Sequence, residues 1–286
     1  MKTFYLLLSL PVLILFSCDS PNYHKDYVLK FKGSESMHRA FWMLKSEFEQ
    51  KQDSVKIILE GGGSRTGLMA IKDGSADVGL SSYRFNLDST LGNGHGVTER
   101  VVAYDGIILI SNKRNPIQQL NNEQINMIFS GSISDWSQLG GLPGQILPIV
   151  RDENSGTQKF FQNYFNIENL NPLAEIASDN KSIVSRVNKN QNGIGFIGFG
   201  YFTERIQRLE IPTSPGHDTA FTTPTFENLG QGKYPLRRPL QMYYKDAENP
   251  GLQAFLNFLG TREAQLIIKE EGLLPESENT SLIVNR

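Results

Sequence analysis

One stretch of the sequence combines the residue types that bind an oxyanion. Arg151 stands four positions before Ser155-Gly156-Thr157, and aromatic residues recur at helical spacing over 160–165, which predicts a helix that begins near Ser155. Backbone N–H groups in the first turn of a helix have no intrahelical partner, and the helix dipole adds about half a positive charge there. The guanidinium of Arg151 is a planar fork that can bind two oxygens at once. The stretch therefore suits an oxyanion, although an ordinary helix cap with surface charges fits these residues equally well.

At three places in the first 82 residues, a predicted strand runs into small polar residues that carry hydroxyl groups. Residues 27–32 run into 33–37, 55–59 run into 60–67, and 76–80 run into Ser81-Ser82. Each could be an ordinary turn, because glycine and serine dominate turns. The repetition of hydroxyl-bearing junctions instead favours a shared binding role.

The elements that position these residues alternate along the chain. Buried strands are predicted at 101–110 and 146–150, and a capping box at Asn121 and Gln124 opens a helix that ends at Gly131. Alternating strands and helices indicate an α/β fold with mainly parallel sheets. The run 193–198 matches G-x-G-x-x-G by letter, but no helix is predicted after it, so a dinucleotide site is not expected.

The N-terminus has the pattern of an export signal. Lys2 precedes an apolar run of 13 residues, 4–16, which is too short to span a membrane and suits a signal peptide over residues 1–17. Ser17-Cys18 resembles a bacterial lipobox, in which the cysteine carries the lipid; a plain signal peptide with an incidental cysteine is the alternative. Residues 18–26 would form a polar tether.

Composition excludes several function classes. The formal net charge of −2 gives no reason to expect a nucleic-acid partner. The chain has one cysteine, so no internal disulfide is possible, and its four histidines lack metal-ligand spacing. We expect no metal and no cofactor.

Taken together, these stretches resemble the PstS-like substrate-binding lipoproteins of bacterial phosphate ABC importers. The resemblance covers roughly residues 27–275 and rests on an ordered set of motifs. These are Gly33-Ser34-Glu35-Ser36-Met37, Gly61-Gly62-Gly63-Ser64, Ala76 to Ser82, Tyr104-Asp105-Gly106, Asn115-Pro116-Ile117, Ile128 to Gly131, Arg151 to Thr157, Gly193 to Phe196 and Tyr234-Pro235-Leu236.

The resemblance implies a two-lobed, periplasmic-binding-protein-like (type II) α/β fold with the ligand in the cleft between the lobes. Lobe 1 would comprise 27–107 and 232–286, and lobe 2 would comprise 108–231. The implied phosphate contacts are Ser36, Met37 (through its N–H), Ser64 and Ser82 from lobe 1, and Arg151, Ser155, Gly156 (through its N–H) and Thr157 from lobe 2. Glu153 matches an acidic position that pairs with the binding arginine.

The chain departs from the family pattern at Ser82. Some members have an aspartate there, which accepts the proton of hydrogen phosphate and repels sulfate. Glu35 is a candidate replacement, or else an acidic residue favourably placed at a helix N-terminus. Arg65 would add positive charge to the cleft or face water, and Arg84 follows the paired serines as an arginine does in other branches of the family.

The implied function is capture of inorganic phosphate and its delivery to the permease of an ABC importer. The protein would be a monomer, held at the periplasmic or cell surface by a lipid on Cys18 and not itself an enzyme. Two alternatives stay open: binding of another oxyanion such as sulfate, and phosphate sensing or adhesion without transport. A serine hydrolase is not expected, because the Ser178-x-x-Lys181 and Ser178-Asp179-Asn180 motifs overlap on one serine and Lys-Thr-Gly is absent.

Overall fold

The computed structural model describes residues 26–214 and 220–276. The predicted signal peptide, Cys18 and the tether up to residue 25 therefore lie outside the described residues. The first part of the chain forms β1 (Tyr27–Gly33), α1 (Glu35–Lys51), β2 (Val55–Glu60), α2 (Ser64–Asp73), β3 (Val78–Ser81), α3 (Leu87–Leu91) and β4 (Thr98–Asn112).

The middle of the chain forms α4 (Asn122–Ser130), the 3-10 helix η1 (Trp136–Leu139), β5 (Leu147–Arg151), α5 (Gly156–Tyr164), β6 (Glu175–Ala177), α6 (Asn180–Lys189), β7 (Gly193–Gly198), the 3-10 helix η2 (Phe199–Tyr201), β8 (Ile206–Arg208), β9 (Ile211–Pro212), β10 (Phe221–Thr222) and α7 (Phe226–Gly230). The last part forms β11 (Arg237–Tyr244), α8 (Pro250–Leu259), α9 (Arg262–Glu270) and β12 (Leu274–Pro275).

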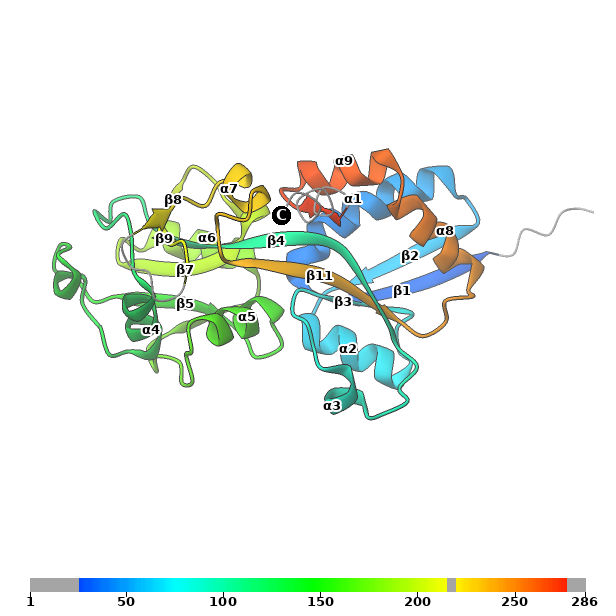
Figure 1. Ribbon diagram of the computed structural model, residues 1–286, viewed down its shortest axis with the longest axis horizontal. Helices are drawn as coiled ribbons and strands as arrows, with labels where there is room; N and C mark the ends of the chain where they lie inside the picture. Colours follow the sequence, from blue (N-terminus) through cyan, green and yellow to red (C-terminus); the bar gives the residue numbers. More distant parts are fainter. Residues whose placement is uncertain (1–25, 215–219, 277–286) are drawn as a thin grey trace, which may run out of the picture.

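Two long strands join two α/β lobes. The strand order is β2-β1-β3-β11-β4-β7-β5-β6. The first part of β4 pairs with β11, and the second part, from Ile107 onward, pairs with β7. In Figure 1, β4 and β11 run side by side from one lobe to the other, so a residue near their middle lies at the junction of both lobes.

The expectation of mainly parallel sheets was wrong for the centre of the molecule. The pairs β1–β2, β1–β3, β5–β6 and β5–β7 are parallel. The crossing strands pair antiparallel with each other and with β3 and β7, because a chain that leaves a lobe on one strand and returns on its neighbour reverses direction.

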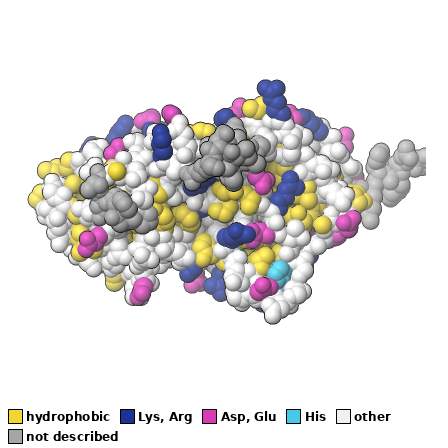
Figure 2. All heavy atoms as spheres, viewed as in Figure 1, with side chains coloured by type: hydrophobic (Ala, Val, Ile, Leu, Met, Phe, Trp, Pro, Cys, Tyr) yellow, Lys and Arg dark blue, Asp and Glu magenta, His cyan; other side chains and the backbone are white. Residues whose placement is uncertain are grey.

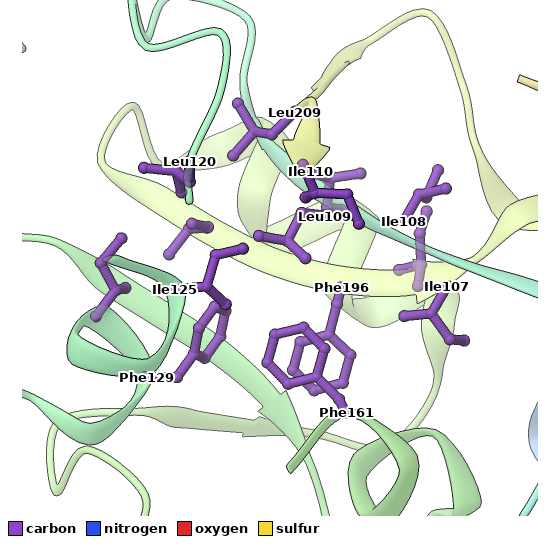
Figure 3. Close-up of a cluster of buried hydrophobic side chains, with 14 of the residues drawn as sticks. Ile107, Ile108, Leu109, Ile110, Leu120, Ile125, Phe129, Phe161, Phe196 and Leu209 are labelled. Atoms are coloured by element: carbon purple, nitrogen blue, oxygen red, sulfur yellow. The ribbon is translucent and has the colours of Figure 1, made fainter. Parts of the chain in front are cut away.

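Each lobe has its own hydrophobic core. In lobe 1, Phe31, Phe41 and Phe48 pack around Phe255 of α8. In lobe 2, the central contact is between Phe161 of α5 and Phe196 of β7, whose rings stack 3.8 Å apart and 6° from parallel (Figure 3). This contact fixes α5, and with it the predicted oxyanion-binding stretch, against the lobe 2 sheet.

Local sequence signals account for the helix ends. The capping box of Asn121 and Gln124 is present, and α4 ends at Gly131 in the left-handed conformation, as expected. Ser155 is the N-cap of α5, which confirms the predicted start of that helix. The run 193–198 is the buried strand β7, followed by a 3-10 helix of three residues, Phe199–Tyr201.

Candidate anion-binding site

The N-termini of four helices converge where the two lobes meet. The first or second helical residues are Ser36 of α1, Ser64 of α2, Thr157 of α5 and Asn180 of α6. Ser36 Oγ lies 2.8 Å from Thr157 Oγ1 and accepts a long hydrogen bond of 3.5 Å from Asn180 Nδ2. Because each helix start presents unpaired N–H groups and a partial positive charge, this convergence attracts an anion.

The end of β3 adds further hydroxyl groups. Ser34 Oγ donates to Ser82 Oγ at 2.9 Å, and the Ser82 N–H donates to Ser64 Oγ at 3.0 Å. These serines, together with Ser36 and Thr157, are buried. We call Ser34, Ser36, Ser64, Ser82 and Thr157 the hydroxyl cluster.

Gly156 brings the two lobes into close contact at the hydroxyl cluster. A Cβ atom at this position would lie 2.3 Å from Ser64 Oγ and 2.8 Å from Ser82 Oγ. Glycine is therefore required at the start of α5 for a reason of space, since its φ is not in the left-handed region.

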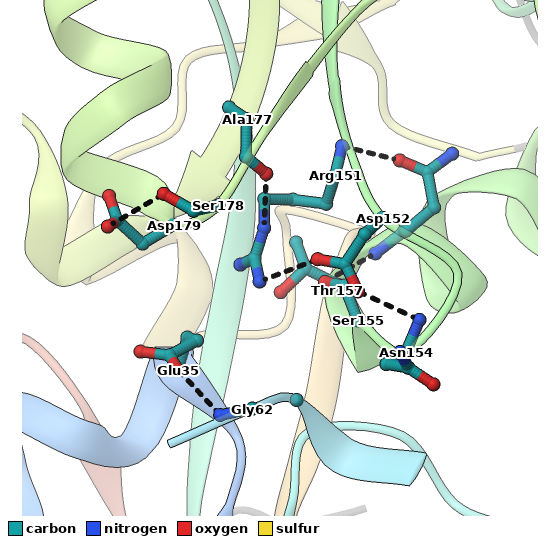
Figure 4. A network of polar contacts seen from close by, with 12 residues as sticks. Glu35, Gly62, Arg151, Asp152, Asn154, Ser155, Thr157, Ala177, Ser178 and Asp179 are labelled. Atoms are coloured by element: carbon teal, nitrogen blue, oxygen red, sulfur yellow. Dashed lines mark hydrogen bonds and ion pairs between the residues drawn. The ribbon is translucent and has the colours of Figure 1, made fainter. Parts of the chain in front are cut away.

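Arg151 reaches the same region from the end of β5 and is 2% exposed. Its Nε donates to the Ala177 carbonyl at 3.1 Å, and its Nη2 contacts Asp152 Oδ2 at 3.3 Å. Figure 4 shows the guanidinium held between these two groups, beside Ser155 and Thr157. The two contacts fix the plane of the guanidinium and leave other N–H donors for a ligand.

A second buried arginine lies on the crossing strand β11. Arg238 donates through Nη1 to Ser82 O at 3.1 Å and to Thr157 Oγ1 at 3.0 Å, and through Nη2 to Ser36 Oγ at 3.0 Å. Its Nη2 also donates to Asp105 Oδ2 at 2.8 Å. Arg238 and Asp105 stand directly opposite each other on β11 and β4, so the register of the crossing strands creates this ion pair.

Burial opposes the charge on both members of the pair. It raises the pKa of Asp105, whereas the charge and hydrogen bond of Arg238 and the N–H groups of Phe199 and Gly106 lower that pKa. Burial likewise lowers the pKa of Arg238, against the charge of Asp105, and the nearby positive charge of Arg151 lowers it further. Two guanidinium groups are thus close enough to repel each other, an arrangement that an anion between them relieves.

The structure brings together most of the predicted ligand residues. Ser36, Ser64, Ser82, Gly156 and Thr157 meet in one place. Two further predicted contact residues, Ser155 and Met37, have structural roles. Ser155 Oγ accepts the N–H of Gln158 as the α5 cap, and the N–H of Met37 donates to Ser34 O at 3.1 Å while its side chain lies in the lobe 1 core.

Three residues predicted to support the site make other contacts or face solvent. Glu35 Oε1 accepts the N–H of Gly62 at 2.7 Å, so this carboxylate holds the glycine-rich loop (Figure 4). The Arg65 side chain is exposed, and Arg84, with 73% of its side chain exposed, pairs with Glu99 at 3.0 Å.

The assignment of Glu153 to Arg151 was wrong. Glu153 is exposed, and the carboxylate that contacts Arg151 is that of Asp152. The loop turns between β5 and α5, which directs the side chain next to Arg151 toward the guanidinium and the following one toward solvent.

Sequence reasoning missed Ser34, Asp105, Asn180 and Arg238. Arg238 had a usable signal, because Leu236, Arg238, Leu240 and Met242 alternate on one buried face of a strand. A charged residue at a core position of such a pattern is expected to have a buried partner. The identity of that partner follows only from strand register.

A pocket of about 330 Å³ opens beside the hydroxyl cluster, lined by Glu35, His38, Arg39, Trp42, Asp179, Lys181 and Tyr201. Cationic and anionic side chains are interspersed on the molecular face in Figure 2. Within residues 26–214 and 220–276, no group of three histidine, cysteine or carboxylate side chains could hold a metal ion. None of the helices described has the length and apolar character that crossing a bilayer requires.

Comparisons with known proteins agree with this geometry. The chain is 24% identical over 253 residues to the phosphate-binding protein PstS of Bacillus subtilis, covering 87% of this chain and 81% of that protein. It is 27% identical over 266 residues to the phosphate-binding protein PstS of Pseudomonas aeruginosa, covering 85% of this chain and 81% of that protein.

Solved structures share the fold. A Clostridium perfringens protein whose crystal structure has phosphate bound superimposes with a TM-score of 0.77 at 28% identity, covering 87% of this chain and 99% of that chain. An ABC-type phosphate transport receptor from Vibrio cholerae gives a TM-score of 0.71 at 25% identity, covering 86% of this chain and 99% of that chain. The predicted two-lobed fold and the resemblance to PstS-like proteins are thereby confirmed. Since a family model described as the PBP superfamily domain matches residues 20–263, the chain belongs to the PBP superfamily.

Proposed function

We propose that this protein is an extracytoplasmic receptor that binds inorganic phosphate between its lobes and delivers it to the permease of an ABC importer. The observation that carries the proposal is the buried hydroxyl cluster at four helix N-termini, flanked by Arg151 and Arg238. Relatives and structural neighbours over most of the chain are named as phosphate-binding or phosphate-transport proteins. In this proposal the protein acts as a carrier and not as an enzyme, which the phosphate-binding and transport names of its relatives support.

The proposed ligands are Ser36, Ser64, Ser82, Arg151, the Gly156 N–H and Thr157. Hydrogen bonds to a charged partner contribute about 1.5–3 kcal/mol each. The sum of several such bonds exceeds the roughly 8 kcal/mol of micromolar binding. The surplus offsets the cost of desolvating a multiply charged anion and of ordering the lobes. Ser155 and Met37 support the site through the first turns of α5 and α1.

The proposed lobes are 27–107 with 232–286, and 108–231. The change of partner along β4 at Ile107, from β11 to β7, supports the first boundary. Ligand that contacts both lobes stabilises the closed form over the open one. In this proposal the protein is a monomer, tethered through a lipid on Cys18 outside the cytoplasmic membrane.

A sulfate-like oxyanion is the second candidate, and Ser82 is the observation that favours it. The Ser82 side chain contacts other hydroxyl groups, Ser34 Oγ and Ser64 Oγ. A hydroxyl can accept the proton of hydrogen phosphate, but it does not repel a fully ionised anion as a carboxylate does. The other alternative is a surface protein that senses phosphate or mediates adhesion. Such a protein would bind the same ligand but would not deliver it to a permease.

Calorimetric titration of the soluble chain from Pro21 with phosphate and with sulfate tests the proposal. We expect phosphate binding that Arg151→Ala weakens by at least about 100-fold, because the variant removes a charge-assisted bidentate donor. Arg114→Ala removes an exposed arginine and is the matched control. Equal binding of both anions would favour the sulfate-like reading, and no heat with either would overturn the proposal.

A further inference from the structure

Arg238 makes contacts that a residue serving only to bind phosphate would not need. It comes from the crossing strand β11, its side chain is 0% exposed, and it donates to groups from both lobes. Ser36 and Ser82 belong to the lobe 1 side of the cluster, and Thr157 belongs to α5 on the lobe 2 side. One rigid guanidinium therefore sets the relative positions of α1, β3 and α5.

The direction of these hydrogen bonds determines whether the hydroxyl groups can donate to an anion. An arginine N–H can only donate, so Ser36 Oγ and Thr157 Oγ1 must accept from Arg238. A hydroxyl that accepts from a cation still has its own proton to donate, and the cation makes that proton a stronger donor. One of these two hydroxyls donates to the other across 2.8 Å. An anion that enters the cluster can receive both protons.

Asp105 limits the other contribution that Arg238 could make. The carboxylate takes one N–H of Nη2 at 2.8 Å and neutralises much of the guanidinium charge in a fully buried position. The charge that is available to the anion therefore comes mainly from Arg151, whereas Arg238 supplies directed N–H groups.

We propose that Arg238 is a positioning residue, which orients the Ser36 and Thr157 hydroxyls as donors toward a bound dianion and aligns the two lobes for that purpose. This inference rests on the proposed function, and it identifies the doubly ionised form of the oxyanion as the preferred ligand. The phosphate dianion has three unprotonated oxygens and one O–H group, whereas the monoanion has two of each, so the dianion offers more acceptors for the hydroxyl protons and fewer competing donors.

The test is phosphate titration of Arg238→Gln at about pH 8 and about pH 5.5, where the dianion and the monoanion of phosphate dominate. We expect binding to weaken by about 100-fold at the higher pH and by less than about 10-fold at the lower pH. The control is Arg237→Gln on the same strand. Arg237 stacks over the Tyr104 ring at 4.4 Å, so its loss should change phosphate affinity less than about 3-fold at either pH.

The outcomes separate this inference from the proposed function. Absence of phosphate binding by the unmodified chain overturns the proposed function and the inference with it. The inference alone is overturned if the unmodified chain binds phosphate normally and Arg238→Gln loses the same affinity at both pH values. It is also overturned if Arg238→Gln loses no more affinity than Arg237→Gln.

A second variant covers the case in which Arg238→Gln does not fold. Arg238→Lys keeps the cation beside Asp105, but a single ammonium group lacks the fork that reaches Ser36 and Thr157 together. We expect a folded protein with about 10-fold weaker phosphate binding at about pH 8. Affinity equal to that of the unmodified chain would overturn the inference.

Discussion

Charge pairs at the residue scale differ sharply in burial. Arg238 and Asp105 are almost fully buried, whereas Arg84 and Glu99 form a surface pair with 73% and 18% of their side chains exposed. Desolvation of the buried pair is expensive, and the carboxylate is kept in place by contacts with Arg238 and with the Phe199 N–H. The consequence of losing one partner should therefore differ greatly between the two pairs.

Asp105→Asn should lower the free energy of unfolding by about 3–5 kcal/mol, because it leaves Arg238 buried without a countercharge. Glu99→Gln should cost less than about 1 kcal/mol, since its partner is exposed to water and screening ions. Urea unfolding followed by circular dichroism measures both. Similar losses for the two variants would contradict the argument. The double change Asp105→Leu and Arg238→Met should recover much of the stability, because it removes both buried charges.

At the element scale, α6 begins with a charged cap that faces the site. Asp179 is its N-cap and accepts the N–H of Ser182 at 2.7 Å. Burial alone would raise the pKa of Asp179, but hydrogen bonds from Ser182 and Ser178 and the charge of Arg151 together lower it. A lowered pKa in the folded state means that the ionised cap stabilises the fold.

Asp179→Ala should cost about 1 kcal/mol of unfolding free energy at neutral pH through loss of the cap. The ionised carboxylate contributes fully above its ordinary pKa of about 3.9, and its contribution is lost as pH falls through the lower folded value. The difference between the two proteins should therefore shrink below about pH 4. Urea unfolding at several pH values measures it.

Asp179→Asn is the matched control for this helix. Asparagine keeps the side-chain oxygen that caps α6 but has no proton to titrate, so its stability near neutral pH should stay close to that of the unmodified chain. A difference between Asp179→Ala and the unmodified chain that stays constant down to about pH 3 would contradict an ionised cap.

At the scale of the whole molecule, the lobes touch directly around the site. Tyr201 Oη donates to Glu35 O at 2.8 Å, Arg39 Nη1 donates to Gly200 O at 3.0 Å, and the Arg65 N–H donates to Asn154 O at 3.2 Å. Burial raises the pKa of Tyr201 to about 12, so this hydroxyl remains a donor throughout the range of pH used for binding. These contacts describe a closed arrangement in which little room separates α5 from α2.

Gly156→Ala should hold the lobes apart. The added Cβ would overlap Ser64 Oγ and Ser82 Oγ on the opposite lobe, and close packing allows no such overlap without movement. We expect phosphate affinity to fall by at least about tenfold, together with a larger radius of gyration in small-angle X-ray scattering with phosphate present.

Gly230→Ala is the control for this substitution. A Cβ at Gly230 would lie 3.7 Å from a Leu274 methyl carbon, an ordinary van der Waals distance, so affinity and radius should not change. Normal phosphate affinity in Gly156→Ala would mean that α5 can shift without cost, and would contradict close contact of the lobes as a condition for binding.

The sequence by itself determined the features that depend on neighbouring residues. The helix start at Ser155, the capping box at Asn121 and the hydroxyls at helix N-termini all follow from local spacing and turn chemistry. Five of the predicted ligand positions meet in the structure, because parallel strands followed by helices bring the helix N-termini to one edge of a sheet.

Only the tertiary structure decided the features that depend on register and direction. Asp105 and Arg238 are 133 positions apart, and a shift of one residue between β4 and β11 would turn one of them to the other face. The choice of Asp152 over Glu153 depends on the turn between β5 and α5. Whether Arg65, Arg84 and Glu35 face the cleft depends on packing, which spacing along the chain does not encode. The buried Arg238–Asp105 pair beside the proposed ligand is thus set by strand pairing, while Arg151 and the hydroxyl groups are set by local sequence.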